Sequence, residues 1–282
     1  MKSEFTTTYG NHMQCGFSWE IVQEGWIDMN YRKLIREKIK ILKEEFGCYS
    51  IKAEFEAEGS RKDELIMLRE FVETADLGLI IKIGGCEAMH DIDQCKLLGA
   101  TGIMAPMIET PFAVTKFKGA VTKLFGNKPE VECIINAETR TCLANFDEIL
   151  SAGEGFLTGV TVGRSDLSAS MGIPRSEIET EPIFNATKEF CEKARSYGLT
   201  TNFGGNIGLE TIPFILQMEP VIDRFETRKV VLLKSNDSLF LEKAIKCALE
   251  FELLYLRFKS EYYRSMAEED AARIVRLEKQ LK

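Results

Sequence analysis

The sequence predicts an α/β fold: a (β/α)8 TIM barrel with an extra N-terminal helix and an extended C-terminal helical tail. From residue 48 onward, short apolar segments rich in β-branched residues alternate with amphipathic stretches of helical period. The expected strand ends recur every 20 to 40 residues, close to one βα unit of about 30 residues. A chain of 282 residues suits one barrel of about 250 residues with an appendage, although the pattern alone also allows a doubly wound open sheet.

The strands are expected where apolar runs end in polar residues or glycine. Seven are expected, at 49–56, 79–83, 102–106, 131–137, 159–162, 200–203 and 225–232. A diverged strand near 14–22 would complete the eight. The stretches of helical period between the strands include 62–73, 112–124, 141–150, 183–197 and 209–218.

Helical segments flank the repeats on both sides. Before them, apolar residues from Tyr31 to Phe46 mark one face of a helix, and after them 239–258 reads as a long amphipathic helix. The tail 265–282 is mostly charged and carries an apolar side that includes Ile274 and Leu277, so it is either a solvated helix or a surface that packs on a neighbouring subunit. We therefore expect a barrel domain over 1–258 and a candidate oligomer-forming tail over 259–282.

The composition excludes several functional classes. The net charge is −8 and no stretch gathers Lys and Arg into a patch, so the sequence gives no support for nucleic-acid binding. The polar N-terminus lacks the apolar core of a signal peptide, and no run of about 18 apolar residues predicts a membrane span. Eight dispersed cysteines without a CxxC pair indicate reduced thiols and a cytoplasmic protein. Only His12 and His90 are present, which excludes a histidine-rich metal site.

Charged residues inside two predicted strands are candidates for a site. Lys52, Glu54, Glu56 and Glu58 alternate with apolar residues and share one strand face, which either points into the barrel or is solvated. Lys82 interrupts an apolar run and precedes two glycines, so it is either an ion-pair partner or a site group that a ligand can approach closely.

Two carboxylates follow consecutive strands at matching positions. Glu138 and Asp166 are 28 residues apart, which places both at the carboxyl ends of adjacent strands, where barrel active sites form. Two like charges held close together need a cation or a shared proton between them, and oxygen-only ligands favour Mg2+ or Mn2+. The alternative is that both carboxylates only cap helices.

Two weaker signals lie further along the chain. The glycine-rich run 204–208 precedes an expected helix, but it matches no dinucleotide or P-loop spacing, so a plain tight turn is the better interpretation. Glu226 and Arg228 share a strand face and could simply pair with each other.

Three motifs in this order resemble the HpcH/HpaI aldolase and citrate lyase β family. They are IKIGGCEAMHDIDQCKLLGATGIMAPMIETPFAVTKF (81–117), NAETRTCLANFDEIL (136–150) and GVTVGRSDLSASMG (159–172). The likeness covers roughly residues 48–235 and is strongest over 81–172. It implies a phosphoenolpyruvate-mutase-like barrel, a small-molecule 2-oxo acid substrate and a homo-oligomer, often a hexamer that exchanges a C-terminal helix between subunits.

The resemblance also implies roles for individual residues. Glu138 and Asp166 would bind the divalent metal, and the turn at Gly163, Arg164 and Ser165 would offer backbone N–H groups to the substrate carboxylate. The sequence departs from the family in two places, because Lys82 stands where the family has an arginine and no histidine follows the first strand.

The leading interpretation is a metal-dependent carbon–carbon lyase acting at a pyruvate-like centre. Lys82 would stabilise the enolate together with the metal, and Glu56, or else Glu54, would transfer the proton in place of the absent histidine. Two alternatives stay open: a Schiff-base aldolase that uses Lys82, and a catalytically silent barrel that binds a carboxylated metabolite or acts as an assembly component.

Overall fold

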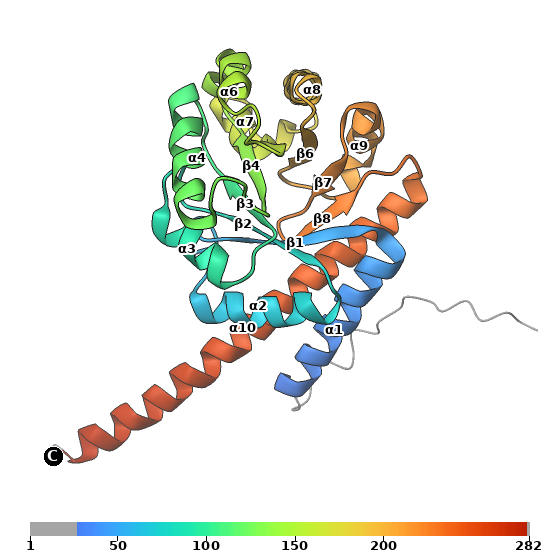
Figure 1. Cartoon of the computed structure of the whole chain (residues 1–282). Helices are drawn as coiled ribbons and strands as arrows, with labels where there is room; N and C mark the ends of the chain where they lie inside the picture. Colours follow the sequence, from blue (N-terminus) through green and yellow to red (C-terminus); the bar gives the residue numbers. More distant parts are fainter. Residues whose placement is uncertain (1–26, 281–282) are drawn as a thin grey trace, which may run out of the picture.

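The computed structural model describes residues 27–280 and shows a closed barrel of eight strands (Figure 1). The strands are β1 Cys48–Glu54, β2 Gly78–Lys82, β3 Gly102–Ala105, β4 Glu132–Ala137, β5 Gly159–Gly163, β6 Thr200–Gly204, β7 Arg224–Glu226 and β8 Val230–Leu233. The predicted barrel is therefore confirmed. The strand expected near 14–22 lies outside the described residues, and the barrel closes with strands from 48–233 alone.

The segment 225–232 was expected to be one strand, and that prediction is wrong. The chain reverses at Thr227, whose backbone N–H donates to Val230 O at 2.9 Å and whose hydroxyl accepts from Val230 N at 3.1 Å. The segment thus forms a hairpin, and β8 pairs antiparallel with both β7 and β1, whereas all other neighbouring strands are parallel. The hairpin turn lies at the carboxyl end of β7, the end of the barrel where active sites form.

Ten α-helices cover the barrel within the described range. They are α1 Ile27–Phe46, α2 Lys62–Thr74, α3 Met89–Leu97, α4 Pro111–Phe125, α5 Arg140–Ala144, α6 Phe146–Ala152, α7 Arg164–Ser170, α8 Glu181–Ser196, α9 Ile212–Met218 and α10 Ser238–Gln280. The stretch 141–150 breaks into α5 and α6 at Asn145, whose side chain donates to Glu109 O at 2.9 Å. The stretch expected to start at Leu209 opens with the single 3-10 turn Leu209–Thr211.

The barrel interior divides into an apolar layer and a polar layer. Ile80, Met104, Ile134 and Val231 pack together with Tyr49 near the amino ends of the strands. Two residues further along β2 and β4, the interior side chains are those of Lys82 and Asn136. The interior is therefore polar directly beneath the carboxyl ends of the strands. The main apolar core lies between the strands and the surrounding helices.

Helix α10 is a single element of 43 residues that joins the predicted helix 239–258 to the charged tail. Its first half packs on α1, where Lys38 Nζ donates to Glu250 Oε2 at 2.7 Å, and the buried side chains on one side of the helix run from Leu241 to Phe258. Beyond residue 263 the side chains are exposed, and Figure 1 shows this part projecting away from the barrel. Within the described part of the chain, no helix combines the length and apolar character that a membrane span requires.

Candidate active site

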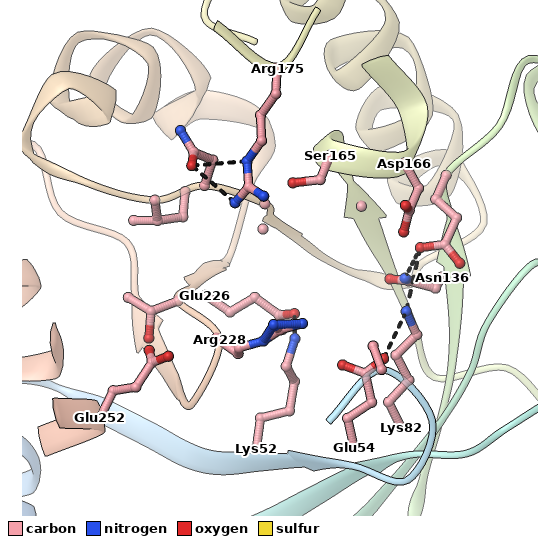
Figure 2. Close-up of a pocket in the computed structure, with 18 of the residues that line it drawn as sticks. Lys52, Glu54, Lys82, Asn136, Ser165, Asp166, Arg175, Glu226, Arg228 and Glu252 are labelled. Carbon is pink, nitrogen blue, oxygen red and sulfur yellow. Dashed lines mark hydrogen bonds and ion pairs between the residues drawn. The ribbon is translucent and has the colours of Figure 1, made fainter. Parts of the chain in front are cut away.

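A cavity of about 540 Å3 opens at the carboxyl ends of the strands (Figure 2). Its wall is more polar than apolar, with residues from β1, β2, β4, β5, β6 and β7, the turn after β5 and helix α10. The ionisable side chains that line it are Glu54, Glu138, Asp166, Glu210, Glu226, Glu252, Lys52, Lys82, Arg175 and Arg228. The carboxylates outnumber the cations by six to four, so the lining carries an excess of two negative charges.

Glu138 is a buried carboxylate that follows β4. Its side chain accepts hydrogen bonds from the backbone N–H of Met107 at 2.9 Å and from the Asn136 amide. Burial raises the pKa of the Glu138 carboxyl above its ordinary value, and the Asp166 carboxylate adds to this rise, while Lys82 and the Met107 N–H oppose it. The site therefore holds a carboxylate whose charge is only partly compensated by its neighbours.

Asp166 stands beside Glu138 in the first turn of α7, as the 28-residue spacing predicted. Unlike Glu138 it is exposed, because it lies on the open wall of the cavity. Gly163 makes this pairing possible, since a Cβ at that position would lie 2.6 Å from Glu138 Oε2. The sequence-based expectation that these carboxylates meet at one level is supported, and helix capping does not describe Glu138, which caps no helix.

Lys82 bridges two carboxylates from opposite sides. Its Nζ lies 3.6 Å from Glu138 Oε2 and 3.7 Å from Glu54 Oε1, so the cation belongs to the site and is also an ion-pair partner (Figure 2). Lys82 is therefore an ion-pair partner, which is one of the two roles that the sequence left open, and it also lines the cavity. Glu54 is 7% exposed and lines the cavity.

Glu56 lies apart from this group. Strand β1 ends at Glu54 and a turn follows, in which Gly59 N donates to Glu56 O at 3.0 Å. Glu56 is consequently exposed and does not line the cavity. Its carboxylate lies beside Gly84, where an added Cβ would be 3.7 Å from Glu56 Oε2. The alternation of residues along the strand allowed either Glu54 or Glu56 to face the cavity, and in the structure it is Glu54 that does so.

A second buried network joins β1 to β6 and β7. Lys52 pairs with Glu226, whose other oxygen accepts from the Asn202 amide at 2.6 Å. Burial opposes the charge on Lys52, but contact with Glu226 outweighs it and holds the pKa of Lys52 above its ordinary value. Because Glu226 pairs with Lys52 and Arg228 lies 3.6 Å from Glu58, the expectation that Glu226 and Arg228 pair with each other is wrong.

The turn that precedes Asp166 has two different faces. Gly163 and Ser165 line the cavity, as expected for backbone groups that meet a substrate. The Arg164 side chain points the other way: it is fully buried and donates to Gly204 O at 3.3 Å and Gly205 O at 2.7 Å. Only its backbone is available on the cavity side.

The donor set fits a hard divalent cation. Glu138 and Asp166 supply anionic oxygens, and the Asn136 Oδ1 atom beside them is buried without a hydrogen-bond partner among the described residues. A doubly charged cation would balance the negative excess of the cavity lining. Within residues 27–280 no group of three His, Cys, Asp or Glu side chains is arranged to hold a metal ion, so water or substrate would have to complete the coordination of a cation on Glu138 and Asp166.

Several cavity residues were not singled out by the sequence. Asn136 was overlooked although it stands two residues before Glu138, the spacing that places both on one face. Arg175 reaches the cavity from a 3-10 turn and donates to Asn206 Oδ1 at 3.2 and 3.1 Å. Glu252 comes from α10, and no local sequence signal relates a residue so far along the chain to this wall.

Comparison with known proteins relates the chain to a protein family and to solved structures. Residues 64–203 match the family model of the HpcH/HpaI aldolases and citrate lyases. The chain belongs to this family. A curated relative, the hydroxypyruvate/pyruvate aldolase of Rhizorhabdus wittichii, is 30% identical over 159 residues, which are 46% of this chain and 62% of the relative. The chain thus spans less than two thirds of that relative's length.

Solved structures of the family share the fold. An HpcH/HpaI aldolase from Desulfitobacterium hafniense superposes with a TM-score of 0.56 and 14% identity, over 70% of this chain and 82% of that one. A family protein from Burkholderia cenocepacia gives the same TM-score and identity, over 80% of this chain and 90% of its own. At this identity the likeness supports the barrel architecture alone.

Proposed function

We propose that this protein is a divalent-metal-dependent aldolase that cleaves or forms a carbon–carbon bond at a pyruvate-like 2-oxo acid. The observation that carries the proposal is the pairing of buried Glu138 with Asp166 at the ends of adjacent strands, with Lys82 3.6 Å from Glu138. Membership of the aldolase and citrate lyase family supports the same class of reaction.

Each residue has a part in this proposal. Glu138 and Asp166 would hold Mg2+ or Mn2+, which when bound supplies Lewis-acid stabilisation of the keto oxygen as it gains charge. Lys82 would add a second positive charge beside the developing enolate, in a site whose groups are already oriented. Backbone N–H groups of Gly163, Arg164 and Ser165 would receive the substrate carboxylate, a role that leaves the Arg164 side chain free for another function.

The proton-transfer group is proposed to be a carboxylate on β1. Glu54 lines the cavity and stands 3.7 Å from Lys82, while Glu56, the residue first expected in this role, is exposed beyond the strand end. A general base must come within hydrogen-bond reach of the proton it moves, so the geometry favours Glu54.

The direct test is exchange of the pyruvate methyl protons with deuterated water, followed by NMR with Mg2+ or Mn2+ present. Glu138→Ala and Asp166→Ala should each abolish the metal-dependent exchange, because each removes one proposed metal ligand. Glu132→Ala is a suitable control, since this carboxylate pairs with Arg224 near the opposite end of the barrel. Unchanged exchange in folded Glu138→Ala or Asp166→Ala protein would refute the metal assignment.

A Schiff-base mechanism at Lys82 is the second candidate. It requires a neutral amine, whereas Lys82 Nζ lies between two carboxylates, an arrangement suited to an ammonium ion. Borohydride treatment with pyruvate distinguishes the two mechanisms by mass spectrometry, because only the Schiff base leaves a covalent adduct on Lys82. Absence of both exchange and oxalate binding in the metal-loaded, folded protein would instead favour a silent barrel.

A further inference from the structure

We propose that the Arg164 side chain is a positioning residue that fixes the glycine-rich wall Gly204–Gly205–Asn206 against the turn before Asp166, and so sets the width of the keto-acid site. This inference rests on the proposed function, because it concerns the same cavity. It differs from the expected role of position 164, which involved its backbone N–H alone.

Three polar contacts hold the Arg164 guanidinium on the far side of this wall. Its Nε and one terminal nitrogen donate to the carbonyl oxygens of Gly204 and Gly205, at 3.3 and 2.7 Å. The other terminal nitrogen donates to Glu179 Oε2 at 2.8 Å. A fixed planar fork can satisfy two neighbouring carbonyls and a carboxylate at once, whereas a lysine ammonium lacks this geometry.

Aromatic packing fixes the guanidinium further. Its central carbon lies 4.4 Å from the centre of the Phe214 ring and 5.0 Å from that of Phe203. The side chain has no solvent exposure, and burial lowers the pKa of Arg164, an effect that contact with Glu179 opposes. Burial of a charge destabilises the fold unless specific partners compensate for the lost hydration. For Arg164 these partners are the two wall carbonyls, Glu179 and the two aromatic rings.

The wall itself adopts backbone conformations that need such support. Gly205 has φ +96° and lies so close to the turn that a Cβ there would come within 2.6 Å of Ser165 N. Asn206 has φ +56°, which non-glycine residues adopt uncommonly, and it accepts two hydrogen bonds from Arg175. The carbonyls that Arg164 holds thus belong to the segment that carries Asn206, the hydrogen-bond partner of Arg175, in the cavity lining.

Among the described residues, the polar and ring contacts of the Arg164 side chain are with the wall, with Glu179 and with the two rings, and none is with a proposed metal ligand. Its loss should therefore displace the wall and weaken keto-acid binding without removing the charged groups of the reaction. Rearrangements of about 1 Å in a positioning element can cost up to about 100-fold in efficiency.

The test compares Arg164→Lys and Arg164→Met with Arg224→Lys. Arg224 is a matched control because it also packs on an aromatic ring, that of Tyr49, and pairs with Glu132, but near the opposite end of the barrel. We expect KM for pyruvate, and Kd for oxalate by calorimetry, to rise about 10-fold or more in Arg164→Met, with kcat less affected and partial rescue in Arg164→Lys. Arg224→Lys should alter stability while KM stays at the wild-type value.

A second measurement reports on the order of the wall segment and does not depend on catalysis. Amide hydrogen exchange of residues 203–208 should accelerate in Arg164→Lys and not in Arg224→Lys, and Glu179→Gln serves if the Arg164 variants do not fold. Wild-type KM in a folded Arg164→Met protein, or unchanged exchange of 203–208 in Arg164→Lys, would overturn the inference. If the wild-type protein is inactive and Arg164→Lys still shows the accelerated amide exchange, the result would count against the proposed function and leave the positioning role intact.

Discussion

At the scale of single residues, the site holds neighbouring carboxylates whose negative charge is only partly compensated by Lys82. Glu138 is 1% exposed and shares its surroundings with Asp166, and its nearest cation, Lys82, is divided between two carboxylates. Such an arrangement costs stability unless a further positive charge is present. Sites that tolerate this cost are commonly those in which the charge serves a reaction.

The first prediction concerns the stability of the metal-free protein. Because the folded-state pKa of Glu138 is raised, the folded chain binds this proton more tightly than the unfolded chain does. The associated stabilisation is present at low pH and is lost as the pH rises through the raised pKa. With a chelator present, Glu138→Gln should therefore unfold with a free energy about 1 kcal/mol larger than wild type at pH 8, and the difference should shrink toward pH 5.

Urea denaturation at the two pH values measures this difference. The neutral amide still accepts one hydrogen bond, and rotation of the Asn136 amide would offer its unpartnered Oδ1 to the new NH2 group. Glu132→Gln is the control and should be less stable than wild type at pH 8, because it loses an ion pair with Arg224. A Glu138→Gln protein that is less stable than wild type at pH 8 would contradict this explanation.

The second prediction separates the two β1 carboxylates. Glu54→Gln should lower kcat for aldol cleavage by about 100-fold, because it removes the carboxylate that faces the cavity next to Lys82. Glu56→Gln should have the smaller effect, since its side chain is exposed outside the cavity. Steady-state kinetics with the same substrate and metal compares the two variants, and a larger loss in Glu56→Gln would favour the assignment first made from the sequence.

At the scale of elements, the β7–β8 hairpin distinguishes this barrel from eight repeated βα units. The turn between the strands takes the place of a crossover helix and brings Arg228 into the cavity, as Figure 2 shows. Within the described chain, Arg228 Nε lies 3.6 Å from Glu58 Oε1, an ion pair that leaves the two terminal nitrogens available to a ligand. The neighbouring cavity wall includes Leu249 and Glu252 of α10.

The third prediction follows from this placement. Arg228→Leu should raise KM for the aldehyde partner about 10-fold, because a polar group of that substrate loses a charged hydrogen-bond donor. Metal-dependent proton exchange of pyruvate should stay unchanged, since Lys82 and Glu138 lie on the other part of the wall. Arg228→Lys is the conservative comparison. Equal loss of pyruvate exchange would mean that Arg228 serves the keto-acid half.

At the scale of the whole molecule, α10 has a buried half and an exposed half. From residue 264 to 280 every side chain is exposed, including Met266, Ile274, Val275 and Leu277, which are large and apolar. Helices that stand alone in water are marginal, and an exposed apolar side usually packs on something. These features favour the proposal that the tail packs on a second copy of the chain.

The fourth prediction tests the tail. Deletion of 265–282 should leave the urea midpoint of the barrel nearly unchanged, because the side chains of residues 265–280 are all exposed. The same deletion should reduce the oligomer to smaller species, which light scattering coupled to size exclusion measures directly. A full-length protein that is already monomeric at micromolar concentration, or a truncated one that keeps its mass per particle, would contradict this role.

The sequence by itself determined the barrel and predicted that Glu138 and Asp166 are neighbours at one end of it. The alternation of apolar and amphipathic segments reflects which residues are buried. Because Glu138 and Asp166 each follow the end of one of two consecutive strands, the sequence predicted that they lie close together. The family model matches residues 64–203, a range that includes both carboxylates. These features are local or periodic, so they can be read without coordinates.

Tertiary structure decided where strands end and which way single side chains point. Glu54 and Glu56 share one alternation, and only the end of β1 at Glu54 turns the second carboxylate out of the cavity. The reversal at Thr227 depends on barrel closure with β1, and the direction of Arg164 depends on rings and carbonyls about 40 residues away. Contacts between distant segments leave no periodic trace in the sequence, because their free energy arises only once the barrel has formed.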